Sequence, residues 1–75
     1  MNINHLHSGE FAVITGFTED INTDSRLLEM GLLPGSVIRM IKQAPFGGPI
    51  ELKIKDYYLS LRVEDSAKII VKKKT

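Results

Sequence analysis

A chain of 75 residues with 43% hydrophobic side chains can bury one small core, so we expect a single domain over residues 1–75. Its formal net charge of +1 argues against a dedicated nucleic-acid surface, and the absence of cysteine excludes disulfides and thiolate metal sites. No apolar run approaches the roughly 20 residues that span a bilayer, and the first residues lack a signal-peptide pattern, so we expect a cytoplasmic location.

The first strand is predicted over residues 10–18, after a lead-in that Ile3 and Leu6 anchor. The stretch is rich in β-branched and aromatic residues, which are typical of strands. Its apolar side chains fall on both faces, so the strand is expected to lie centrally in a sheet or under a helix. Gly16 predicts either a close backbone approach or a bulge.

A helix of barely two turns is predicted next, from residue 22 or 23 to about residue 30. Gly31 suits the left-handed conformation that ends a helix, which places Leu27 and Leu32 at the two positions that commonly touch across such an end. The dipeptide Pro34-Gly35 suits the centre of a type II turn, where proline fixes the first position and glycine permits the second. These signals predict a sharply defined connection into the next strand.

The rest of the chain predicts four more strands. They cover residues 36–44, 50–55, about 57–63 and 68–72, with a loop at 45–49, a tight turn at Asp56-Tyr57 and one helical turn at 64–67. Residues 72–75 are expected to form a solvated tail. Five short strands cannot form two stacked sheets of useful size, whereas a bent barrel removes the sheet edges. We therefore predict a mainly β fold, a small SH3-like barrel of about five antiparallel strands with one short α-helix between the first and second strands.

Groups suited to catalysis or metal binding are few. His5 and His7, the only histidines, are two residues apart in an expected extended segment, so both face one side. They are weak candidates for a metal site, because two ligands do not close one, and we assign no cofactor. The acids are expected to be solvated, since none accompanies a nucleophile and a base in a recognisable motif; they include Asp20, Asp24, Asp56, Glu64 and Asp65. We therefore predict no enzymatic activity.

Exposed apolar side chains are the stronger functional signal. Phe46 lies at the tip of a loop, where it is either folded back as a lid or exposed to a partner. Around Gly31, packing in the core accounts for most of the leucines but leaves Leu33 without an internal role. Tyr57 and Tyr58 could contribute to a groove for proline-rich peptides, although the lack of tryptophan disfavours such an adaptor.

The segment Arg26-Leu27-Leu28-Glu29-Met30-Gly31-Leu32-Leu33-Pro34-Gly35 resembles the signature of the FeoA family, the small cytosolic component of bacterial ferrous iron transport. Further matches are Leu6 with Gly9-Glu10, Ala44-Pro45, Gly48-Pro49, Leu61-Arg62, Ala67 and Ile70, so the resemblance covers essentially the whole chain. The same domain resembles the C-terminal module of DtxR-type iron-dependent repressors, but without the preceding winged helix. One departure is Asp56, at a turn position where the family typically has glycine; aspartate tolerates left-handed geometry well enough to keep the turn.

The resemblance implies an accessory protein that binds the cytoplasmic, GTPase-bearing region of the membrane transporter FeoB and thereby supports or regulates ferrous iron uptake. No metal chemistry in the chain itself is implied. The predicted partner contacts are Arg26, Met30, Leu33, Pro34, Phe46 and Arg62. The alternative is a transition-metal-binding or iron-sensing domain, in which His5 and His7 would act with a nearby acid. An exposed apolar junction is also compatible with self-association.

Overall fold

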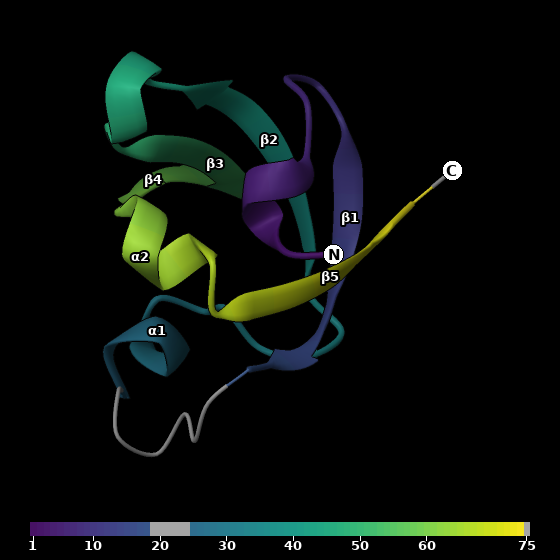
Figure 1. Ribbon diagram of the computed structural model, residues 1–75. Helices are drawn as coiled ribbons and strands as arrows, with labels where there is room; N and C mark the ends of the chain where they lie inside the picture. The colour runs from purple at the N-terminus through teal and green to yellow at the C-terminus, as the bar shows by residue number, and fades with distance from the viewer. Residues whose placement is uncertain (19–24, 75) are drawn as a thin grey trace.

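Five strands form one antiparallel sheet in the order β4-β3-β2-β1-β5. The computed structural model describes residues 1–18 and 25–74, except the side chains of residues 25 and 26 (Figure 1). The elements in chain order are η1 (Ile3–His5), β1 (Phe11–Phe17), α1 (Ser25–Glu29), β2 (Val37–Gln43), η3 (Pro45–Gly47), β3 (Ile50–Ile54), β4 (Tyr57–Leu61), α2 (Val63–Ser66) and β5 (Ile69–Lys73). The mainly β architecture with a short helix between the first two strands is confirmed. The predicted start of that helix, at residue 22 or 23, lies outside the described residues.

The sheet is strongly curved (Figure 1), and its buried side chains form one hydrophobic core. Every strand contributes to it, and β3 shows the simplest pattern, because its first, third and fifth residues are buried while the two between them are partly exposed. Leu27 and Leu32 enter the core from either side of the end of α1. Ile3 and Leu6, the predicted anchors of the lead-in, are at most 1% exposed. The lead-in is not extended, however, since it contains η1, which contacts α2 and β5.

The end of α1 has the predicted geometry. Gly31 has a φ of +88°, and its N–H donates to the carbonyl of Leu28 at 3.0 Å. The N–H of Leu32 donates to the carbonyl of Leu27 at 3.2 Å. This pair of hydrogen bonds defines a Schellman cap, in which the two flanking leucines are brought together. Both of those leucines are fully buried.

The turn that follows is also as predicted. Gly35 has a φ of +92°, and the N–H of Ser36 donates to the carbonyl of Leu33 at 3.0 Å, which closes a type II turn over Pro34. The turn is joined to β1, because the N–H of Gly35 donates to the carbonyl of Ile14 at 2.7 Å. Residues 27–36, hereafter the junction, are therefore fixed by hydrogen bonds at both ends.

Two irregularities bend the sheet. The register of β1 against β5 shifts between Ile14 and Gly16, which supports the bulge, one of the two alternatives predicted at Gly16. A second shift, between Met40 and Lys42, interrupts the pairing of β2 with β3 and was not predicted. Bulges increase local twist and bending, so these two sites help the five strands curve around one core.

The turn between β3 and β4 differs from the prediction. It consists of Lys55 and Asp56, and Tyr57 is already the first residue of β4. The residue with positive φ is Lys55, at +52°, so the left-handed conformation expected at Asp56 lies one residue earlier. A two-residue connection is the commonest way to join antiparallel strands, and it fixes the register of the hairpin.

Two charged residues are less solvated than predicted. Lys73, assigned to a free tail, is the last residue of β5, and its side chain contacts Glu10 at 2.5 Å. Asp65, assigned to the surface, is only 6% exposed and lies 3.6 Å from Arg62. Buried carboxylates are normally paired, and this pair follows an i,i+3 spacing at the first turn of α2.

Candidate functional site

The junction presents apolar side chains to solvent on a fixed backbone. Leu33 is 46% exposed, although its neighbour Leu32 is completely buried, and Pro34 is exposed as well. The cap at Gly31 and the turn at Gly35 hold the segment from both sides. An exposed leucine that is already rigid loses little conformational entropy when a partner covers it. Leu33 and Pro34 are therefore well suited to a protein contact.

Tyr57 extends this exposed area from β4. Its hydroxyl donates to the carbonyl of Met30, one of the groups left unpaired at the end of α1, and the ring stays 43% exposed. Met30 itself is half-buried and packs against the core, so it has an internal role that the prediction did not give it. The side chain of Arg26, another predicted contact, lies outside the described part of the structure. We define Leu33, Pro34 and Tyr57 as the junction surface.

The other two predicted contacts, Phe46 and Arg62, lie at the opposite end of the sheet. Phe46 is fully exposed in η3, where its φ of +58° turns the backbone into a left-handed conformation. The strand register fixes the separation: Leu61 pairs with Ile50, whereas Tyr57 pairs with Ile54. Four steps along a strand span about 13 Å. The predicted contacts whose side chains the structure describes are therefore divided between two ends and do not form one patch.

Arg62 is an exposed cation that already forms one ion pair. Its side chain is 64% exposed but its Nε lies 3.6 Å from a carboxylate oxygen of Asp65. Because most of the Arg62 side chain stays in solvent, the guanidinium can contact a partner while it keeps its pair with the buried Asp65.

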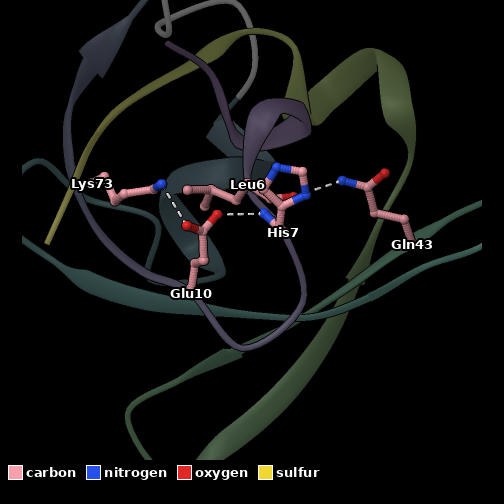
Figure 2. Close-up of polar contacts among 5 residues, drawn as sticks. All are labelled: Leu6, His7, Glu10, Gln43 and Lys73. Carbon is pink, nitrogen blue, oxygen red and sulfur yellow. Dashed lines mark hydrogen bonds and ion pairs between the residues drawn. The ribbon is translucent and has the colours of Figure 1, made fainter. Parts of the chain in front are cut away.

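Polar contacts among five residues anchor the lead-in, and no sequence motif predicted them (Figure 2). The two carboxylate oxygens of Glu10 contact different groups: one accepts from the backbone N–H of His7 at 2.6 Å and the other lies 2.5 Å from the ammonium of Lys73. On the other side, the amide of Gln43 donates to the carbonyl of Leu6 at 3.0 Å. The hydrogen bond from Lys73 is the main cause, and that from His7 the second, of a lowered pKa of the Glu10 carboxyl.

We expect Glu10→Gln to lower the free energy of unfolding at neutral pH. The folded pKa of Glu10 lies below its unfolded value of about 4.3, so this stabilisation is present above that value and is lost as the pH falls through the folded pKa. Urea unfolding between neutral and acidic pH should show the parent and the variant converging at low pH. Glu51→Gln is the matched control, because it removes a carboxylate from a longer contact, 3.8 Å to Lys42. A difference that is independent of pH would contradict the electrostatic origin.

The metal-binding alternative finds no ligand set in the described residues. Among residues 1–18 and 25–74, no three histidine, aspartate or glutamate side chains are grouped so that they could hold a metal ion. His5 ends η1, and its Nδ1 accepts from the N–H of Asn2 at 3.1 Å, so the two histidines do not share the extended segment that was predicted. Asp20 and Asp24 lie outside the described residues. Within the described chain, no helix is long and apolar enough to cross a bilayer.

The bent five-stranded sheet, with one short helix between β1 and β2, defines a small β domain of the SH3-like kind. A model of the FeoA domain matches residues 1–73. The chain therefore belongs to the FeoA family, as the signature in the junction predicted. A curated relative, the Fe(2+) transport protein A/Fe(2+) transporter FeoB fusion protein of Porphyromonas gingivalis (strain ATCC BAA-308 / W83), is 41% identical over 71 residues. These residues are 95% of this chain but 8% of the fusion protein.

Solved structures agree on the fold. Iron(II) transport protein A from Clostridium thermocellum matches with a TM-score of 0.88 and 30% identity, over 97% of this chain and 45% of that one. FeoA of Stenotrophomonas maltophilia, solved with zinc and described as a prokaryotic SH3 domain protein, matches with a TM-score of 0.81 and 24% identity, over 96% and 89%. ScaR with bound Cd2+ has a TM-score of 0.85 at 16% identity, over 99% and 35%. The present chain thus spans less than half of the C. thermocellum chain.

Proposed function

We propose that this chain is a non-enzymatic accessory protein of ferrous iron uptake, which binds the cytoplasmic, GTPase-bearing region of a FeoB-type transporter. The observation that carries the proposal is the P. gingivalis fusion protein, in which a segment 41% identical to this chain is joined to FeoB. A covalent link keeps two modules at a high effective concentration. Such a link is useful when the modules act on each other, which supports an association between the same two partners on separate chains.

The junction surface supports the proposal physically. It offers a leucine, a proline and a tyrosine on a backbone that hydrogen bonds already hold in place. Interface energy is concentrated in a few such anchors, and aromatic residues are enriched among them. We assign the main contact to Leu33, Pro34 and Tyr57, with Met30 beneath them and Arg26 preceding them in the chain.

Phe46 and Arg62 form a second candidate contact at the far end of the sheet. The backbone of Phe46 occupies a conformation that costs a non-glycine residue about 1 kcal/mol or more. The ring gains no burial in return, since it is fully exposed. A partner that covers the ring would offset this cost, so we propose that Phe46 reaches another part of the same transporter region.

Leu33→Asp tests the main contact. We expect the variant to bind the purified cytoplasmic region of FeoB about 30-fold more weakly, because a lost apolar anchor costs about 2 kcal/mol. Affinities would be measured by isothermal titration calorimetry. Ser8→Asp is the control, since it adds the same charge at an exposed position in the turn before β1. Circular dichroism establishes that both variants are folded.

The outcomes separate the parts of the proposal. If Leu33→Asp binds as well as the parent but Phe46→Ser does not, the contact lies at η3 and the junction surface is wrong. If the parent itself does not bind, the proposed function is wrong. Self-association is the alternative role of the junction surface, and sedimentation of the parent and of Leu33→Asp tests it. A dimer that forms in the parent but dissociates in the variant would assign this surface to self-association.

A further inference from the structure

A row of four side chains crosses the outer face of the sheet from β1 to β4. The register pairs Phe11 with Arg39. It pairs Arg39 with Lys53, and Lys53 with Tyr58. In the two central strands, the residues on either side of Arg39 and Lys53 belong to the core, so by alternation these two side chains point away from it. Phe11 and Tyr58 extend the row on the same face through the register. Its two ends are exposed aromatics, 46% for Phe11 and 61% for Tyr58.

The two cations in the row are held by the rings beside them. The guanidinium carbon of Arg39 lies 5.2 Å from the centroid of Phe11, and the Nζ of Lys53 lies 5.6 Å from that of Tyr58. Like charges directly opposite each other on a sheet are destabilising, and the cation–π contacts offset part of that cost. Across residues 1–18 and 25–74, neither cation has an ion-pair partner. Their charge is therefore available to a ligand.

Three of these four side chains, those of Phe11, Arg39 and Lys53, also line a groove. It has a volume of about 340 Å³ and is bounded by Phe11, Val37, Ile38, Arg39, Lys53 and Lys55. Three of the six are cations, and Phe11 and Val37 are exposed apolar residues, Val37 at 39%. Two of the lining residues are close to the junction in the chain, since Val37 directly follows Ser36 and Lys55 lies two residues before Tyr57.

We propose that this basic groove binds an acidic segment of a protein partner, whose carboxylates meet Arg39 and Lys53 while an apolar side chain of the segment covers Phe11 and Val37. A guanidinium can bind a carboxylate with two parallel hydrogen bonds. The proposed function supplies the identity of the partner, so we place the segment in the cytoplasmic region of the transporter.

Charge complementarity favours an acidic peptide over a nucleic acid. Domains that bind nucleic acids are commonly basic overall, with an isoelectric point above about 9. This chain has a net charge of +1 and an isoelectric point of about 8.1, so it lacks the overall positive charge that such domains commonly have. The rings of Phe11 and Tyr58 also each have a cation over one face, which reduces the ring surface on which a base could stack.

The test compares three proteins: the parent, Arg39→Gln/Lys53→Gln, and the control Lys42→Gln/Lys68→Gln, which removes two positive charges outside the groove. Affinity for the purified cytoplasmic region of FeoB is measured at low and high salt. We expect the groove variant to bind about tenfold more weakly than the parent at low salt and to depend less on salt, because two charge contacts are lost. The control should stay within about twofold. Thermal unfolding of each variant verifies its fold.

The outcomes distinguish this inference from the proposed function. If the parent binds and the groove variant binds equally well with the same salt dependence, the groove is not the site, although the function stands. If the parent does not bind, the assignment to the transporter is overturned. The chemistry of the groove is then decided by a fluorescein-labelled peptide of alternating glutamate and leucine, which the parent should bind more tightly than its glutamine counterpart. Equal binding of the two peptides, or tighter binding of a labelled oligodeoxythymidine, would overturn the acidic-segment assignment.

Discussion

Leu32→Ala is expected to lower the free energy of unfolding by about 2–5 kcal/mol, the range for deleting a buried leucine side chain. Leu32 is completely buried in the core, next to the cap of α1. A domain of this length has a total stability of roughly 4–11 kcal/mol, at about 0.05–0.15 kcal/mol per residue. The variant would therefore lose a large part of its stability, which urea unfolding followed by circular dichroism would measure.

The adjacent Leu33→Ala is the matched control. The same atoms are removed one residue along the chain, but Leu33 is 46% exposed, so the expected loss is below about 1 kcal/mol. If the two variants were equally destabilised, the division of the junction into a buried and a presented leucine would be wrong. In that case a loss of partner binding in Leu33→Asp could reflect unfolding, so the stability comparison comes before the binding experiment.

The junction can be predicted from sequence because its determinants are local. Gly31 and Gly35 permit the left-handed conformation and Pro34 fixes its own φ, and the hydrogen bonds that these turns imply join residues at most five apart. The alternation in β3 is equally local, since a strand with one buried face repeats every two residues. The prediction of the fold class and the resemblance to the family both rest on these local features.

The basic groove could not be predicted in the same way. Its row of side chains needs the register of four strands at once, and a one-residue slip would turn any strand's side chains to the other face. The unpredicted bulge between Met40 and Lys42 shifts part of that register. The contact between Glu10 and Lys73 joins residues at opposite ends of the chain, and neither residue has a local signal for it.

The candidate site was predicted only in part for a related reason. Exposure at Leu33 followed from its place between two turns, and exposure at Phe46 from its place in a loop. Whether the two residues share a surface depends on the direction of β2, which lies between them in the chain, and a list of exposed residues does not contain that direction. The structure puts these residues at opposite ends of the sheet, so the prediction identified exposed positions without their arrangement.

Gly31→Ala is the second substitution with a large expected effect, about 2–4 kcal/mol in the free energy of unfolding. The φ of +88° costs a residue with a Cβ about 1–2 kcal/mol. The new Cβ would also lie 2.8 Å from the hydroxyl of Tyr57, which would have to leave its hydrogen bond with Met30. Gly35→Ala separates the two causes, because Gly35 has a similar φ of +92° but no atom within 4 Å of an added Cβ.

Tyr57→Phe completes a double-mutant cycle. In the parent background it should cost about 0.5–1.5 kcal/mol, since it removes a hydrogen bond. In the Gly31→Ala background it removes the colliding oxygen, so the cost should shrink to nothing or become a gain. Urea unfolding of the four proteins gives a coupling energy, which we expect to be at least about 0.5 kcal/mol. Purely additive effects would mean that the helix end tolerates a Cβ without moving Tyr57, and glycine at position 31 would then serve backbone geometry alone. A measured coupling would show that this glycine also makes room for the tyrosine of the junction surface, so that one residue ends the helix and places a proposed partner contact.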